Sequence, residues 1–406
     1  MPGADTDDMF ARWPDVEAAG ADCVDPLCDE CDVRGTKRRR RLGATVMSTG
    51  EQEPPTPATT TDAPEPPPAT STDEREPPPP ATATVDGREP PPPLFTLGLM
   101  ADVQSADKPD AAPPVIAPRE LRCRSARARL GSAVDFWSAQ EPRPVAVLNL
   151  GGTVDGRDDS VTTQADLDAV LREFGRLPAP THHVVGNNCL KQLPRDALLR
   201  TLRLSSAYYS APLAAGWRLL VLDTTELSTH GGWAAGSPQD LEARAYLAAH
   251  AGEERMKLPN NGGVGAEQMA WLRSELARAR HEAVRLIVAS HHPLARGACD
   301  EVLRSWTGDE VAALLAESPA VAVVLAGHDH VGGYVRWRGT PFVTLEALLE
   351  VPEGENAYGL LKCWPDRVAI DGCGTRVTSR ELTIGGGDDE EHTSAMPPAP
   401  RTRVQL

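Results

Sequence analysis

The order of apolar and polar positions after residue 93 predicts strands and helices that alternate along the chain. Six short, mostly apolar runs read as buried strands: Leu94–Met100, Val145–Leu150, His182–Val185, Trp217–Leu222, Leu286–Val288 and Val321–Ala326. Helical spacing of i, i+3, i+4 and i+7 lies between them, as in Leu167, Val170, Leu171 and Phe174, and nearly so in Met269, Leu272, Leu276 and Ala279. Residues 160–163 offer caps for the first of these helices. This alternation is typical of an α/β fold.

Small and polar residues follow each predicted strand. The six segments are Asp102-Val103-Gln104, Gly151-Gly152, Gly186-Asn187-Asn188, Asp223, Ser290-His291-His292-Pro293 and Gly327-His328-Asp329-His330. In α/β folds, active sites gather beyond the carboxyl ends of the strands, where side chains from several loops converge. We therefore expect these segments to meet in one site.

The residue types in these segments are those of a metal site. Histidine together with carboxylate and amide oxygens suits Mn, Fe or Zn. A lone His or Asn after a strand usually belongs to a capped turn, whereas repeated metal-type residues at equivalent places favour ligands. His328 and His330 lie two apart on an extended segment, so their side chains point the same way. His292, beside His291, is interpreted as a neighbour with its own hydrogen bonds rather than a ligand.

Residues 1–93 differ in composition from the rest of the chain. They account for a net charge of −10 out of −17, and residues 51–93 contain 15 of the 38 prolines. This composition predicts a disordered acidic, Pro-rich arm over 1–93, a folded domain over 94–383 and a disordered tail over 384–406. Runs of four prolines begin at Pro77 and Pro90 and favour polyproline II. They suit a stiff spacer or a ligand for a proline-motif-binding partner.

Charge and hydropathy exclude several classes of function. The acidic balance argues against nucleic-acid binding, which requires neutralisation of phosphates. No stretch of about 18 apolar residues exists, so we expect no membrane span. The first ten residues contain three Asp and lack the apolar core of a secretory signal. These features favour a cytoplasmic location, while the basic run 37–41 keeps nuclear import open.

Five groups of residues make the chain resemble the calcineurin-like metallophosphoesterase superfamily, and within it the manganese-dependent ADP-ribose/CDP-alcohol diphosphatase group. The groups are Asp102-Val103-Gln104, 148–151 with Val154-Asp155-Gly156, Asn261-Gly262-Gly263-Val264-Gly265 with Gln268 and Trp271-Leu272, 327–334, and Thr344-Leu345-Glu346-Ala347. Gln104 stands where most of the superfamily has His, as it does in this diphosphatase group. The resemblance spans residues 94–383.

The resemblance implies both a fold and a chemistry. The fold is a four-layer α/β metallophosphoesterase sandwich, with two central mixed β-sheets flanked by helices. Two ions, expected to be Mn²⁺, would be held by Asp102, Gln104 and His330 on one side and by Asn187, His291 and His328 on the other. The substrates would be small nucleoside diphosphate conjugates: ADP-ribose would give AMP and ribose 5-phosphate, and CDP-alcohols would give CMP and a phosphoalcohol.

Two residues depart from the family pattern. Gly152 stands at the position of the Asp that bridges both metals, and Asn188 at the position of the catalytic His. Two divalent ions about 4 Å apart repel each other by roughly 16 kcal/mol at an effective dielectric near 20, so a missing bridging carboxylate weakens the pair. Removing a general acid or base costs on the order of 10²–10⁴ in rate. We expect a weak or mononuclear site.

Two classes of function remain open at this stage. One is a metal-dependent pyrophosphohydrolase, active or impaired by Gly152 and Asn188. A swing of Asp155, Asp158 or Asp159 into the bridging position is one way to replace the missing carboxylate. The other is a catalytically degenerate protein of the same fold that binds nucleotides or acts as a scaffold. Action on phosphoproteins or phosphodiesters is less favoured because of Gln104 and the 261–265 segment.

Overall fold

The computed structural model describes residues 91–110, 120–214 and 216–385. The first strand begins at Phe95 and the last ends at Thr383. Most of the predicted arm and tail lies outside the described residues, so their predicted disorder stays a prediction. Within the described ranges, no helix is both long enough and apolar enough to cross a membrane.

Two mixed sheets of six strands form the centre of the fold. The first has the order β12-β11-β10-β1-β2-β3, in which β1, β2 and β3 run parallel to one another and the other three pair antiparallel. Its strands are β1 (Phe95–Met100), β2 (Ala146–Asn149), β3 (Thr181–His183), β10 (Gly359–Cys363), β11 (Arg367–Asp371) and β12 (Arg380–Thr383).

The second sheet has the order β4-β5-β6-β7-β9-β8. Its four inner strands are parallel, and the two outer strands pair antiparallel with them. The strands are β4 (Tyr209–Pro212), β5 (Trp217–Val221), β6 (Arg285–Ala289), β7 (Val321–Ala326), β8 (Gly333–Trp337) and β9 (Thr340–Thr344).

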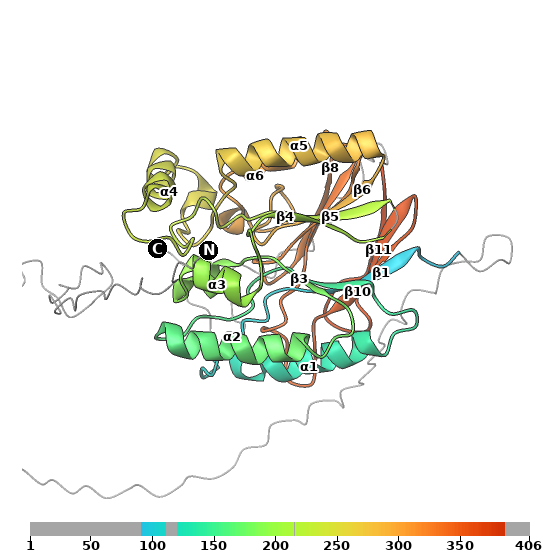
Figure 1. Ribbon diagram of the computed structural model, residues 1–406, viewed down its shortest axis with the longest axis horizontal. Helices are drawn as coiled ribbons and strands as arrows, with labels where there is room; N and C mark the ends of the chain where they lie inside the picture. The colour runs from blue at the N-terminus through green and yellow to red at the C-terminus, as the bar shows by residue number, and fades with distance from the viewer. Residues whose placement is uncertain (1–90, 111–119, 215, 386–406) are drawn as a thin grey trace, which may run out of the picture. The chain divides into compact units, whose positions relative to one another are not determined.

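Helices cover the outer face of each sheet, which completes four layers (Figure 1). On the first sheet lie α1 (Cys123–Ser138) and α2 (Ser160–Phe174), and on the second lie α5 (Ala266–Glu282) and α6 (Gly308–Ala316). Two shorter helices, α3 (Arg195–Thr201) and α4 (Pro238–Ala249), lie in the connections. The predicted four-layer α/β sandwich is confirmed.

The two-residue period of the buried strands builds these layers. In β5, Leu219 and Val221 belong to the core between the two sheets, whereas Leu220 and the following Leu222 pack under the helices of the second sheet. Successive side chains on a strand point to opposite faces, so a strand buried on both faces reads as a continuous apolar run. Most of the predicted runs of this chain are such strands, whereas β3, at the edge of its sheet, is only partly buried.

The boundaries differ from the prediction in small ways. The N-cap of α2 is Asp159 rather than a residue of 160–163, and its carboxylate accepts a hydrogen bond from the Thr162 backbone N–H at 2.8 Å. Strand β4, the strands after β7 and the helices α1, α3, α4 and α6 had no counterpart in the sequence prediction. In β11 the burial alternates residue by residue, and so short an alternating segment gives a weaker signal than an apolar run.

Candidate metal centre

The carboxyl ends of the parallel strands bring the predicted site residues together. Residue pairs across the two sheets become neighbours here: the backbone N–H of His328, after β7, donates to Asp102 Oδ2, after β1, at 2.8 Å. His291 Nδ1, after β6, lies 2.9 Å from the Leu150 carbonyl oxygen, after β2. The loops of both sheets thus form one site, as the sequence predicted.

The first predicted ligand set forms a connected group. Gln104 Nε2 lies 3.1 Å from Asp102 Oδ1 and 2.9 Å from His330 Nε2. His330 Nε2 is in turn 3.7 Å from Asp102 Oδ1. On its other side, His330 Nδ1 lies 2.6 Å from Glu350 Oε1, a carboxylate that the sequence analysis did not identify. Glu350 therefore fixes the ring of His330 so that Nε2 faces Asp102.

The second predicted set is also assembled. His291 Nε2 lies 2.9 Å from Asn187 Oδ1, and the rings of His291 and His328 are 5.1 Å apart. His328 Nε2 lies 2.9 Å from the Oδ1 atom of Asn261, the first residue of the 261–265 segment. All four side chains are at least nine-tenths buried. Asn261 had been noted only as part of a motif, and the structure shows that it contacts this site.

His292 belongs to the same cluster. Nitrogen atoms of His291, His292 and His328 lie within 4.8 Å of one another, and these are the only such group of three metal-type side chains among the described residues. The His292 ring also has partners of its own, Thr224 Oγ1 at 2.9 Å and the Asn260 carbonyl oxygen at 3.3 Å. It therefore has the hydrogen bonds that were expected, in a position next to the predicted ligands.

The backbone at this site is held in an unusual conformation. Asp102, Gln104 and His328 have φ values of 50°, 42° and 69°, in the left-handed region that L residues rarely adopt. Such a conformation costs of order 1–3 kcal/mol per residue and persists where function requires a particular geometry. Three predicted site residues in this state support a functional role for the cluster.

Gly152 lies directly against the Asp102 carboxylate. A Cβ atom added to Gly152 would lie 2.3 Å from Asp102 Oδ1, and the Gly152 φ is +62°. The Asp102 carboxylate thus occupies the space into which a larger residue at 152 would project. Asp102 does not take over the role of the missing bridging carboxylate, because it already belongs to the first predicted ligand set.

The three acidic residues that follow do not fill the gap. Asp155 is held by Lys108 at 2.6 Å and by Lys191 at 3.4 Å. Asp159 caps α2, and Asp158 is exposed. Asp155 and Asp159 therefore do not act as the bridging ligand in this structure, since Asp155 is fixed by ion pairs and Asp159 by its helix.

Two atoms of the second set fit one divalent ion. His291 Nδ1 faces a carbonyl oxygen and therefore carries the proton, which leaves the Nε2 lone pair pointing at Asn187 Oδ1. Two such acceptor atoms 2.9 Å apart match neighbouring ligands of one ion, since bonds of about 2.1 Å at a right angle place them about 3 Å apart. The bridging position does not fit, because Gly152 offers no ligand atom.

Burial and neighbouring charges set the pKa values here in opposite directions. Burial disfavours the charged form of His330, but hydrogen bonds and the charges of Asp102 and Glu350 outweigh it and raise the pKa to about 10. Burial alone would raise the pKa of Asp102, yet His291 and His330 lower it to about 2. Without metal, the fold is therefore stabilised by the His330 imidazolium beside two carboxylates.

This charge arrangement predicts a pH-dependent stability in the chelated protein. The pKa of His330 is higher in the folded state than the usual 6.5, so its contribution is complete below pH 6.5 and declines as pH rises towards 10. Between pH 6.5 and 8, the free energy of unfolding should fall by about 2 kcal/mol more in the parent than in His330→Gln. Urea titrations after EDTA treatment measure this difference; parallel pH profiles for the two proteins would contradict it.

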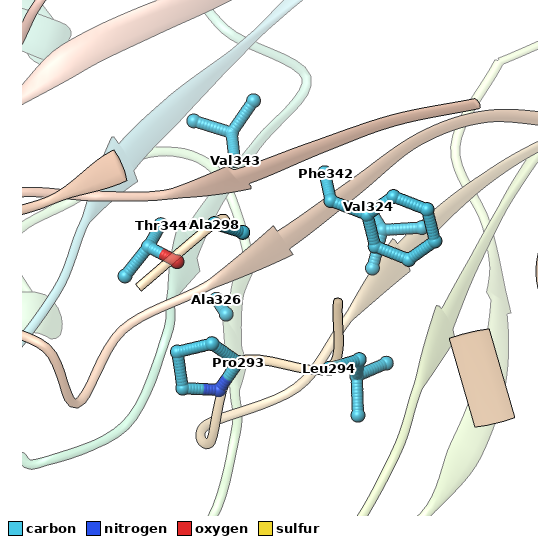
Figure 2. A pocket seen from close by; sticks show the side chains of 8 residues that line it. All are labelled: Pro293, Leu294, Ala298, Val324, Ala326, Phe342, Val343 and Thr344. Carbon is cyan, nitrogen blue, oxygen red and sulfur yellow. The ribbon is translucent and has the colours of Figure 1, made fainter. Parts of the chain in front are cut away.

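Two cavities lie near the site, and they differ in what they can hold. Figure 2 shows the smaller one, of about 10 Å³, lined by apolar side chains of β7, β9 and the segment after His292, with the Thr344 hydroxyl as its polar group. It has room for at most one water molecule. The larger is an open pocket of about 660 Å³, lined by Thr229, His230, Arg244, Leu247, Ala248, Ala251 and Pro259.

The segment 259–261 joins the larger pocket to the histidine cluster. Pro259 lines the pocket, and its carbonyl oxygen lies 3.0 Å from His230 Nδ1. The next residue, Asn260, contacts His292, and Asn261 contacts His328. The pocket and the cluster are thus linked through this segment, although no histidine of the cluster lines the pocket. The pocket volume lies in the range typical of small-molecule sites.

Comparison with known proteins agrees with this arrangement. A model of the family described as calcineurin-like phosphoesterase matches residues 96–332. The chain belongs to the calcineurin-like phosphoesterase family. This membership confirms the resemblance that the sequence motifs indicated. The matched range includes Asp102, Asn187 and the three histidines 291, 328 and 330.

Relatives within this calcineurin-like family carry one name. A protein of Oryza sativa subsp. japonica named "Manganese-dependent ADP-ribose/CDP-alcohol diphosphatase" is 34% identical over 297 residues, which cover 69% of this chain and 91% of the relative. A Homo sapiens protein of the same name is 28% identical over 318 residues, which cover 71% and 92%. A solved dimetal phosphatase from Danio rerio is 27% identical with a TM-score of 0.66, covering 72% of this chain and 99% of that one.

Proposed function

We propose that the chain is a metal-dependent hydrolase that cleaves the pyrophosphate bond of nucleoside diphosphate conjugates, with ADP-ribose and CDP-alcohols as substrates. The observation that carries this proposal is the pair of acceptor atoms His291 Nε2 and Asn187 Oδ1, 2.9 Å apart, inside the larger cluster of metal-type residues. The names of the relatives, which span both monocot and vertebrate proteins, support the substrate class.

Manganese is the metal that this proposal favours. Asp102, Gln104 and His330 would hold one ion, and Asn187, His291 and His328 the other. When bound, divalent ions would neutralise charge on phosphoryl oxygens and would lower the pKa of a bound water molecule towards neutral pH. Because Gly152 supplies no bridging carboxylate, we expect the second ligand set alone to hold one ion more tightly than the two sets together hold two ions.

The residues of the chain position the reacting groups around these ligands. Glu350 orients His330, and the Leu150 carbonyl oxygen fixes the tautomer of His291 so that its Nε2 faces the site. Asn188 lies half-buried on the same short helix as Asn187 and can donate a hydrogen bond to a phosphate oxygen. It carries no proton to the leaving group, so turnover is slower than with a histidine there.

The open pocket is the place for the organic half of the substrate. Leu247, Ala248 and Ala251 offer an apolar surface, and His230 and Arg244 offer polar groups at its edge. A nucleoside needs both kinds of contact. The predicted proline-motif-binding partner of the arm and the cytoplasmic or nuclear location concern other parts of the chain and stay predictions.

The proposal predicts that hydrolysis depends on Mn²⁺. Protein freed of metal with EDTA should convert neither ADP-ribose nor CDP-choline, and added Mn²⁺ should restore formation of AMP or CMP, measured by chromatography. Calcium is the control, because it prefers oxygen ligands to imidazole. If the protein binds ADP-ribose but releases no AMP with any divalent metal, the nucleotide-binding alternative replaces the hydrolase.

A further inference from the structure

The chain uses lysine rarely, and two of its lysines meet at one carboxylate beside the metal-type residues. It contains 36 Arg and only 5 Lys. Lys108 and Lys191, from segments far apart in the sequence, both contact Asp155, three residues after Gly152. The two lysines and the aspartate together carry a net charge of +1, although the chain as a whole carries −17.

The two lysines are held differently. Lys108 Nζ donates to Asp155 Oδ2 at 2.6 Å and to the Asp155 carbonyl oxygen at 3.2 Å. Lys191 Nζ lies 3.4 Å from Asp155 Oδ1, beyond the usual length of a charge-assisted hydrogen bond, and its side chain is 40% exposed. Lys108 thus neutralises the carboxylate, and the ammonium group of Lys191 stays available to another anion.

Lys191 lies one turn after the position of the missing histidine. Asn187–Lys191 form a 3-10 helix, η1, in which side chains three residues apart eclipse one another. Lys191 therefore projects on the side of Asn188, from the helix whose first residue contacts His291. The stem of Lys191 passes over Gly156, where an added Cβ would lie 3.1 Å from Lys191 Cβ.

We propose that Lys191 is a diphosphate-binding residue, whose ammonium group contacts a phosphate oxygen beside Asn188. It supplies the positive charge that Asn188 lacks. The ligand is a singly or doubly charged phosphate or diphosphate group. The inference rests on the proposed function only for the identity of the substrate. Lysine suits this role because its flexible stem can leave Asp155 and reach an incoming phosphate.

The test compares two lysines with similar surroundings. Lys362 also pairs with one aspartate, Asp371, at 2.7 Å, and its side chain is 34% exposed, but it lies on β10 away from the loops of the site. Lys191→Gln should weaken the binding of AMP by about 10- to 100-fold, the range for a hydrogen bond to a charged group. Lys191→Arg should recover most of the affinity, and Lys362→Gln should leave it unchanged.

Two measurements separate this inference from the proposed function. Calorimetric titration with AMP, in the full chain with and without Mn²⁺, reports anion binding directly, and steady-state kinetics with ADP-ribose report KM and kcat. If no protein hydrolyses ADP-ribose but Lys191→Gln still loses AMP affinity, the inference holds and the proposed hydrolase fails. If the parent hydrolyses ADP-ribose and Lys191→Gln retains its AMP affinity and KM, the inference is overturned.

Equal losses in Lys191→Gln and Lys362→Gln would also overturn it, because a general charge effect would then explain both. Thermal melting shows whether each variant is folded. Lys191→Met, which keeps the apolar stem over Gly156, provides a second variant should the glutamine protein melt early. It should show the same loss of AMP affinity as Lys191→Gln.

Discussion

A Gly152→Asp/Asn188→His double variant is expected to hydrolyse ADP-ribose at least about 100-fold faster than the parent protein in Mn²⁺. The aspartate would supply a carboxylate beside Asp102, and the histidine a group that can transfer a proton to the leaving oxygen. Steady-state kinetics measure the gain, and metal analysis should show more Mn²⁺ per chain. Equal, high activity in parent and variant would contradict the idea that these two positions limit turnover.

The structure separates the two substitutions by their effect on stability. Asn188 is half-buried, and a histidine there meets no backbone restriction of the kind found at residue 152. At Gly152 the φ of +62° and the 2.3 Å approach of Asp102 Oδ1 to an added Cβ require strain and a new Asp102 rotamer. The left-handed conformation alone costs about 1–2 kcal/mol for most L residues and less for aspartate. We expect Gly152→Asp to lower the melting temperature.

A matched glycine isolates this cost. Gly354 also has a positive φ, of +82°, and an added Cβ there would meet nothing within 4 Å. Gly354→Asp should therefore show the backbone cost without the contact to Asp102. A larger loss of stability in Gly152→Asp than in Gly354→Asp measures the crowding at the site. Equal losses would mean that Asp102 moves aside without cost.

The second large effect is expected for His291→Ala, which should reduce Mn²⁺ affinity by more than about 100-fold. Loss of a residue that only orients a metal ligand already reduces metal affinity by about 10- to 100-fold, and loss of the ligand itself should cost more. His291 is fully buried, and its Nε2 faces Asn187. Competition with a metal-sensitive dye measures the affinity. Hydrolysis of ADP-ribose should fall with it.

His183 is the control for the cost of removing a buried imidazole. It is also buried, contacts Asn149 at 3.2 Å and packs edge-on against Phe174, outside the metal-type cluster. His183→Ala should lose stability but keep its Mn²⁺ affinity. If His291→Ala binds Mn²⁺ as tightly as His183→Ala does, His291 is not a ligand. The same comparison for His292→Ala decides whether the third imidazole of the cluster contacts the ion.

Much of the site could be predicted because its residues follow directly after apolar strands. Asp102, Asn187, His291 and His328 each lie within a few residues of a strand end, so local pattern and strand direction are enough to group them. Glu350 gave no such signal. It is isolated in the sequence, and only the packing of its loop against His330 places its carboxylate 2.6 Å from the ring.

The acidic residues after Gly152 show the same limit. Their spacing alone leaves Asp155 and Asp159 as candidates for a bridging ligand, because sequence does not show which partner a carboxylate takes. Lys108 and Lys191 are distant from each other along the chain, and the fold brings both to Asp155. The position of Lys191 one turn after Asn188 acquires meaning only once η1 is known to be a 3-10 helix.

The sequence by itself determined the α/β class, because that depends on local periodicity. Its motifs carried the resemblance to the family, which implied the four layers and revealed the two departures at residues 152 and 188. Only the tertiary structure decided which residues surround the predicted ligands: Glu350 behind His330, Asn261 beside His328, His292 within the cluster and the two lysines on Asp155. These contacts join loops of both sheets, and contact between distant segments is set by packing rather than by local pattern.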